Sequence, residues 1–275
     1  MVVEEFPAVT VLTAGRRVAS LAILGDSTAV GLGDPMPAGG WRGVGPLLRA
    51  ALGAPGKIRY RNLSVIGARM ADLRRQQLPG AIAARPDVAV ILAGMNDTLR
   101  SDFDPVALRK DLDVVVAALQ AAGTVVLTIR YHDHGQVFWL PGPLRRVLYH
   151  RIEQLNDAID QVVAQRGALC LDLHRTPGAY DSAAWSVDRL HPSELGYRLL
   201  ACGFADLLTG AGIAVPDPVD LACGGGRQLT AAHHIGWLVC RGTPWLVRRG
   251  RDLLPHVAAV VVQDLFARLR QQLVS

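Results

Sequence analysis

The sequence predicts a three-layer α/β/α domain in which helices cover both faces of a parallel sheet, followed by a C-terminal segment of different character. Short apolar runs bounded by turn residues recur along the chain, and stretches long enough for helices separate them. This alternation is typical of βαβ units, whose strands are buried on both faces. With 275 residues, of which 50% are hydrophobic and 19% charged, the chain can bury such a core.

Five strands and five helices are expected in alternation. The strands are the apolar runs at residues 18–24, 58–63, 88–93, 124–129 and 168–171. The helices are residues 41–52, 70–84, 105–122, 143–166 and 193–208. Boundary residues support the third helix, because Pro105 follows Asp104 as an N1 proline follows an N-cap, and Gly123 stands where a glycine ends a helix.

A domain boundary is expected near residue 214, where the Pro-rich VPDPVD and the Gly-rich CGGGR follow one another. We assign residues 1–214 to the α/β domain and residues 215–275 to an amphipathic helical extension. The extension places Trp237 and Trp245 near Arg248 and Arg249. Two interpretations stay open: its helices pack on the domain or on a second copy in a homodimer, or they contact a membrane surface peripherally.

Charge and hydropathy exclude several classes of protein. The net charge of +5 is carried almost wholly by arginine along the whole chain, which we interpret as a solvated surface with no nucleic-acid partner. The N-terminal MVVEEF lacks the basic and apolar regions of a signal peptide, and no apolar run reaches the ~18 residues that span a bilayer. We expect a cytoplasmic protein, peripheral at the inner face of the membrane if the extension binds lipid.

Residues suited to chemistry follow the predicted strands, at the edge of the sheet where α/β proteins bind ligands. The first strand runs into GDST, which contains Ser27, and the second leads to Gly67. The third ends at GMND, which contains Asn96. The segment DRLHP before the last helix contains Asp188 and His191. These segments are therefore expected to meet at one site.

The residue types at this site fit nucleophilic catalysis. A serine hydroxyl is a weak nucleophile and needs a neighbouring base, most often a histidine that a carboxylate orients. The spacing of Asp188 and His191 lets one imidazole nitrogen bond the carboxylate while the other faces Ser27. The backbone N–H groups of Ser27 and Gly67 and the side-chain amide of Asn96 can donate to an oxyanion.

The four segments, in this order, resemble those of the GDSL or SGNH hydrolases, whose name letters correspond to Ser27, Gly67, Asn96 and His191. The resemblance covers roughly residues 18–210. It implies a flavodoxin-like sheet of strand order 2-1-3-4-5, hydrolysis of esters or thioesters through an acyl-serine, and neither metal nor organic cofactor. It also assigns Asp188 to the catalytic triad. The first segment reads GDST rather than GDSL, a change outside the reacting atoms.

The resemblance gives Asp26 and Asp97 a supporting role in hydrogen bonds that hold the loops. The expected substrate is a small-molecule or lipid-like ester. Two other functions stay open: acyl transfer to a sugar or alcohol, which uses the same acyl-enzyme, and non-catalytic binding on the same fold.

A second group of residues follows the fourth strand. His132, His134, Phe138 and Trp139 are candidates for lining the substrate pocket. Two histidines that flank an aspartate can also bind a metal ion, but no further ligand cluster is visible in the sequence. No metal site is therefore expected.

Overall fold

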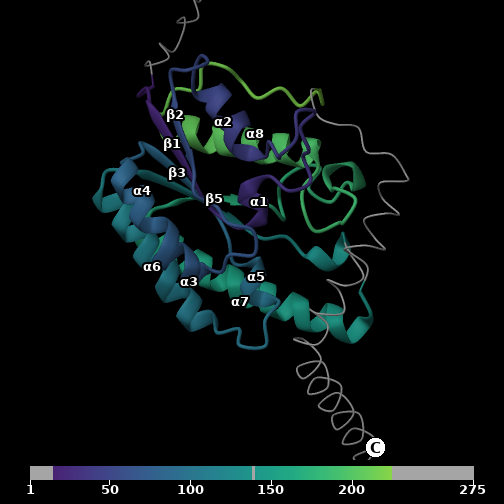
Figure 1. The fold of residues 1–275 in the computed structure, drawn as a ribbon. Helices are drawn as coiled ribbons and strands as arrows, with labels where there is room; N and C mark the ends of the chain where they lie inside the picture. Colours follow the sequence, from purple (N-terminus) through teal and green to yellow (C-terminus); the bar gives the residue numbers. More distant parts are fainter. Residues whose placement is uncertain (1–14, 138–139, 225–275) are drawn as a thin grey trace, which may run out of the picture.

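The computed structural model describes residues 15–137 and 140–224, drawn in colour in Figure 1. Phe138, Trp139 and the part of the expected helical extension from residue 225 onward lie outside the described residues. The predictions of membrane contact or dimerisation through that extension concern the same residues. No helix in the described ranges is long and apolar enough to cross a bilayer.

A five-stranded sheet forms the centre of the domain (Figure 1). Its strands are β1 Ser20–Gly25, β2 Arg59–Asn62, β3 Val88–Leu92, β4 Val125–Arg130 and β5 Leu169–Asp172. All neighbours pair in parallel, in the order β2-β1-β3-β4-β5, which confirms the predicted topology. Strands β1 and β3 are buried along their full length, as their continuous apolar sequences require.

Helices cover both faces of this sheet (Figure 1). One face carries α2 Val44–Leu52 and α8 Glu194–Gly210, which pack on each other. The other carries α4 Leu78–Ala84, α6 Pro105–Ala121 and α7 Gly142–Arg166. Asp104 caps α6 by accepting from the N–H groups of Val106 and Ala107, as its position before Pro105 predicts.

The expected second helix, residues 70–84, differs from a regular helix. It consists of α3 Met70–Asp72, a π-helical turn at Leu73–Gln77, and α4. Pro79 explains the irregular turn, since a proline has no N–H for the carbonyl four residues earlier and its ring clashes with that carbonyl. The wider π-turn avoids this clash and turns Gln77 inward, where it is 2% exposed.

Two short helices that the sequence pattern did not predict follow β1 and β3. They are α1 Ser27–Val30 and α5 Met95–Thr98. Each begins within three residues of the end of its strand, so the residues that follow β1 and β3 meet above neighbouring strands. This arrangement brings the GDST and GMND segments together.

Residues 215–224, the described part of the expected extension, follow an irregular path along α2 and α8. Val215 and Val219 pack against the core of the domain. The N–H of Asp217 donates to the carbonyl of Ala51 in α2. This stretch is thus fastened to the face of the sheet that α2 and α8 cover.

Candidate active site

The end of β1 presents Ser27 at the carboxyl edge of the sheet. The N–H of Asp26 still donates to Leu92 in β3, at 3.0 Å, and α1 begins at the next residue. Gly25 has a φ of +147°, and a Cβ there would lie 2.1 Å from the carbonyl oxygen of Leu92. Only glycine fits this close approach, so the turn depends on Gly25.

Gln77, which the sequence analysis did not single out, holds the same turn from the π-turn. Its Oε1 accepts from the N–H of Gly25 at 2.8 Å, and its Nε2 donates to the carbonyl of Gly25 at 2.9 Å. The side-chain amide thereby adds to the bond that the N–H of Val65 makes to the carbonyl of Gly25, at 3.1 Å, at the end of β1. A π-turn that aims a side chain at a functional residue is a recurrent feature of helices. No local pattern distinguishes Gln77 from Gln76, and this explains why it was missed.

Ser27, His191 and Asp188 form a continuous chain of hydrogen bonds. The Oγ of Ser27 lies 2.7 Å from Nε2 of His191, and Nδ1 of His191 lies 2.7 Å from Oδ2 of Asp188. All three side chains are partly shielded from solvent. The distances are within reach of proton transfer from the hydroxyl to the imidazole.

Asp188 is held as a carboxylate by several donors. Its Oδ1 accepts from the N–H groups of Leu190 and His191, both at 2.9 Å, and from Oγ of Ser186 at 2.7 Å. Burial raises the pKa of Asp188, but the hydrogen bond and charge of His191 and the bond from Ser186 outweigh it and lower the pKa to about 2. Asp188 is therefore ionised at neutral pH. Ser186 is a further site residue that the sequence analysis missed.

Asn96 lies between the two loops, and both hydrogens of its amide are engaged. Nδ2 donates to Oδ2 of Asp26 at 3.1 Å and to the carbonyl of Ala68 at 3.2 Å. The other oxygen of Asp26 accepts from the N–H of Thr28 at 2.9 Å. Burial raises the pKa of Asp26 to about 6, because these donors offset only part of the cost of enclosing its charge.

Gly67 lies on the loop after β2, in the left-handed region at a φ of +80°. A Cβ at this position would meet open space, so backbone conformation rather than crowding favours glycine. Asp97 connects the residues just after Gly67 to α5, because its carboxylate accepts from the N–H of Met70 at 3.1 Å and from Nε of Arg69 at 3.3 Å. Arg69 also pairs with Asp102, at 2.9 Å. The Gly67 loop is thus anchored on the helix that carries Asn96.

His132 and His134 lie behind the His191 loop, buried to 2% and 4% exposure. Their rings pack against Trp185, with centroids 4.7 Å and 5.3 Å from it, and their facing nitrogens are 3.2 Å apart. Burial lowers the pKa of His132 to about 3 and that of His134 to about 4, so both are neutral at pH 7. His132 also lines a small, mainly apolar cavity of about 40 Å³ together with Trp185 and Pro192.

A serine, a histidine and an aspartate linked at the carboxyl edge of a doubly wound parallel sheet are an arrangement suited to acyl-transfer chemistry, the class of reaction that hydrolases of this fold carry out. The chain belongs to the GDSL-like lipase/acylhydrolase family, whose model matches residues 23–199. It is therefore a carboxylic ester hydrolase of the GDSL type.

The chain is also similar to individual proteins, in sequence or in fold. The chain is 27% identical over 165 residues to an acetylxylan esterase of Geobacillus stearothermophilus, a match that covers 54% of this chain and 70% of the relative. The fold is similar to that of LAE5, an α/β hydrolase from the metagenome of Lake Arreo, with a TM-score of 0.56 and 22% identity over 70% of this chain and 95% of the other. It is also similar to a lipase/acylhydrolase of Enterococcus faecalis, with a TM-score of 0.55 and 22% identity over 71% and 97% of the two chains.

Proposed function

We propose that this protein cleaves carboxylic esters through an acyl intermediate on Ser27, with His191 as general base and Asp188 as the carboxylate that orients it. The observation that carries this proposal is the unbroken series of 2.7 Å contacts from Ser27 Oγ through the imidazole of His191 to Asp188. An ionised Asp188 fixes the tautomer of His191 in which Nε2 is free to accept a proton.

The chemistry then proceeds in two halves. Oγ of Ser27 attacks the ester carbonyl while its proton moves to Nε2 of His191, and a tetrahedral intermediate forms. His191 returns the proton to the departing alkoxide, which leaves as the alcohol and gives the acyl-serine. In the second half a water molecule attacks the acyl group, and His191 again takes and returns one proton. The products are the carboxylic acid and free Ser27.

The oxyanion of the intermediate would be stabilised by the N–H groups of Ser27 and Gly67 and by the amide of Asn96. Ser27 is the first residue of α1, where a backbone N–H has no partner within the helix. Asn96 can contribute only if its bond to Ala68 is exchanged or shared, since both amide hydrogens are engaged. One such donor typically changes kcat by about 10²–10³-fold.

The acyl group is proposed to be small or apolar. Two exposed aliphatic side chains, Val65 at 51% and Ile66 at 60%, precede Gly67 and supply an apolar surface on the loop that would bind the oxyanion. The acetylxylan esterase relative adds a carbohydrate acetyl ester as a specific candidate. Acyl transfer to a sugar or alcohol uses the same acyl-serine and differs only in the acceptor.

A panel of p-nitrophenyl esters from acetyl to palmitoyl, together with acetylated xylo-oligosaccharides, tests the proposal. Wild-type protein should release p-nitrophenol, and Ser27→Ala should abolish the release while circular dichroism shows an intact fold. Adding an alcohol acceptor and measuring the ester product separates transfer from hydrolysis. Hydrolysis by Ser27→Ala at the wild-type rate would disprove the acyl-serine route.

A further inference from the structure

The two halves of the triad come from loops far apart in sequence, and the turn after α1 lies directly on the loop that carries His191. A Cβ on Gly33 would lie 2.2 Å from the carbonyl oxygen of Pro192 and 3.2 Å from Cβ of His191. The hydroxyl of Tyr197, buried in α8, donates to the carbonyl of Leu32 at 2.7 Å. The relative position of these two backbones therefore contributes to the distance between Ser27 and His191.

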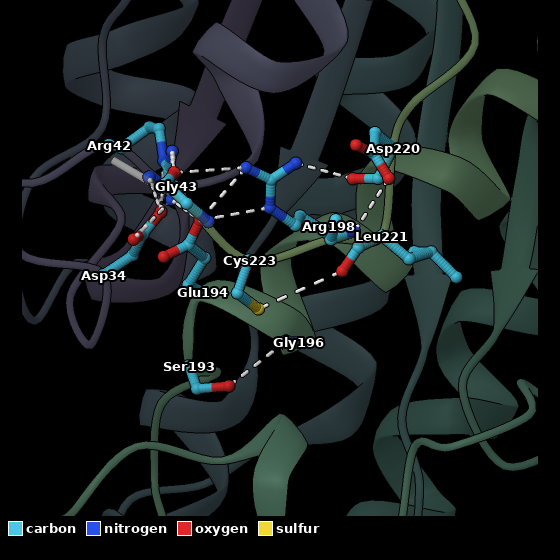
Figure 2. Close-up of polar contacts among 12 residues, drawn as sticks. Asp34, Arg42, Gly43, Ser193, Glu194, Gly196, Arg198, Asp220, Leu221 and Cys223 are labelled. Atoms are coloured by element: carbon cyan, nitrogen blue, oxygen red, sulfur yellow. Dashed lines mark hydrogen bonds and ion pairs between the residues drawn. The ribbon is translucent and has the colours of Figure 1, made fainter. Parts of the chain in front are cut away.

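One guanidinium joins the same two loops. Arg42 binds both carboxylate oxygens of Asp34, through Nε at 2.9 Å and Nη2 at 3.0 Å. Its Nη2 also lies 2.7 Å from Oε1 of Glu194, three residues after His191 (Figure 2). The side chain of Asp34 is fully buried and that of Arg42 is 12% exposed, so water screens this pair weakly.

Residues 215–224 complete the arrangement. The N–H of Gly224 donates to Oε1 of Glu194 at 2.7 Å, and its carbonyl accepts from Nη1 of Arg42 at 3.2 Å. Arg198, one turn along α8, donates to the same Oε1 through Nε and Nη2 (Figure 2). We call Asp34, Arg42, Glu194 and Gly224 the loop clamp.

We propose that Arg42 is a positioning residue for the ester hydrolysis. Through the loop clamp it keeps His191 within hydrogen-bond distance of Ser27. This inference rests on the proposed function of Ser27 and His191. Arg42 does not touch the reacting atoms. It joins the turn that follows the nucleophile helix to the first residue of the helix that follows His191. Because a displacement of about 1 Å at a reacting group can cost about 10²-fold in rate, loosening this connection should lower kcat.

The bidentate geometry makes the proposal specific. Arginine offers a planar fork that can hold Asp34 with two bonds and still reach Glu194, whereas lysine offers a point charge on a flexible stem. Arg42→Lys should therefore retain part of the effect and Arg42→Gln little of it. A role in bulk stability alone would make kcat insensitive to either change below the unfolding temperature.

A matched control is available at Arg166. It binds Asp113 in the same bidentate manner, at 2.7 Å and 2.8 Å, but joins α6 to the end of α7. Arg166→Gln removes a bidentate ion pair that is more exposed, at 33% and 22%, and has no connection to either catalytic loop. Any effect common to both variants reflects the loss of an ion pair, and any effect of Arg42→Gln alone reflects the loop clamp.

The experiment compares kcat and KM for p-nitrophenyl acetate, and the rate of phosphonylation by a fluorophosphonate, in wild type, Arg42→Gln, Arg42→Lys, Glu194→Gln, Arg166→Gln and Ser27→Ala. We expect Arg42→Gln to lower kcat and the phosphonylation rate about tenfold or more with KM within about twofold, and Arg42→Lys to recover part of the loss. Arg166→Gln should keep the wild-type kcat.

Three results would overturn or redirect the inference. An unchanged kcat in Arg42→Gln, or an equal loss in Arg166→Gln, contradicts the loop clamp while an inactive Ser27→Ala leaves the proposed function standing. Activity in Ser27→Ala instead disproves the proposed function itself. If Arg42→Gln does not fold, Glu194→Gln serves in its place, since it removes one charge and keeps an acceptor oxygen; a wild-type kcat there counts against the proposal.

Discussion

The nucleophile turn, residues 25–28, and the histidine loop, residues 186–192, deliver the two partners of one hydrogen bond by different means. The turn is held through its backbone groups: β1 pairs with β3 up to Gly25, the carbonyl of Gly25 accepts from the N–H of Val65, and the side chain of Gln77 bonds both the N–H and the carbonyl of Gly25. The histidine loop is held chiefly by one side chain, since Asp188 bonds four groups inside it, and the loop clamp fastens the start of α8 just after it. A rigid strand end thus faces a loop whose position depends on residues distant in sequence.

The buried Asp26 and the half-buried Asp188 of these regions show the same contrast. Burial raises the pKa of Asp26 to about 6, whereas the pKa of Asp188 falls to about 2 because His191 and Ser186 outweigh its burial. The number and charge of the donors decides the sign of the shift, since both carboxylates are enclosed. Asp188 is suited to a permanent negative charge beside His191, while Asp26 serves as an acceptor for Asn96 and Thr28.

The largest effect should come from removing the charge of the histidine loop. Asp188→Asn should lower kcat by about 10³–10⁴-fold, because a neutral amide no longer stabilises the imidazolium or fixes its tautomer. Steady-state kinetics with p-nitrophenyl acetate measure the loss. Asp181→Asn, an exposed aspartate on the same stretch, serves as the control and should keep full activity. A loss below tenfold in Asp188→Asn would show that the carboxylate does not orient His191.

The next largest effect should come from removing Gln77, which holds the backbone of the nucleophile turn. Gln77→Leu leaves the buried N–H of Gly25 without a partner, while its carbonyl keeps the bond from Val65, at a cost of about 1–3 kcal/mol in the free energy of unfolding. Gln76→Leu, at the exposed neighbouring position of the π-turn, should change it by less than about 0.5 kcal/mol. Urea denaturation of both variants makes the comparison. Equal stability of the two would mean that β1 alone holds the turn.

Acid should affect Asp26 of the nucleophile turn and the two histidines packed behind the histidine loop with opposite sign. His132 and His134 have pKa values of about 3 and about 4 in the folded protein against an ordinary 6.5, so the unfolded chain binds protons more readily and their contribution to stability is lost as pH falls below 6.5. Each of these histidines should lower the free energy of unfolding by about 2 kcal/mol between pH 7 and pH 5. Asp26, whose pKa is raised from 3.8 to about 6, binds a proton more readily in the folded protein than in the unfolded chain. It should therefore raise the free energy of unfolding by about 1 kcal/mol over the same pH range.

Denaturation of His132→Phe at both pH values measures this contribution. The variant should lose less stability on acidification than wild type, while His150→Phe, which changes an exposed histidine of α7, should lose the same amount as wild type. An unchanged pH dependence in His132→Phe would contradict the burial of a neutral histidine behind the loop.

The contact between the regions can be broken by one methyl group. Gly33→Ala places a Cβ against the carbonyl of Pro192 and should lower kcat about tenfold by displacing the His191 backbone. Gly39 has a similar φ, +90° against +100°, but open space around its Cβ position, so Gly39→Ala carries the same backbone strain without the clash. Comparable kcat values for the two variants would show that the turn after α1 does not position the histidine loop.

The fold was largely predictable because apolar periodicity is a local property of the chain. All five expected strands and their order are confirmed, with ends shifted by one or two residues, and four of the five helices match closely. The short helices α1 and α5 escaped prediction because four residues carry too little periodicity to show. The π-turn escaped because a single Pro79 in a helical pattern does not reveal how the chain accommodates it.

The site residues likewise divide into those that a local motif predicts and those that only contacts between distant segments reveal. Ser27, Asp188 and His191 could be found because each stands in a short segment at the end of a predicted strand or before the last helix. Asp26 and Asp97 were also predicted as supports, but Gln77, Ser186 and Arg42 could not be found. The contacts of Gln77 with Gly25 and of Arg42 with Glu194 join residues 52 and 152 positions apart, and only the folded chain brings them together.

The acyl-serine at Ser27 is the central claim, and mass spectrometry of the labelled protein tests it most directly. Reaction with a fluorophosphonate should add one phosphonyl group per chain, located by peptide mapping on the segment that contains Ser27, with loss of esterase activity in proportion. Ser27→Ala should take up no label. Full inactivation with the label on another residue, or esterase activity that survives complete labelling of Ser27, would contradict the account.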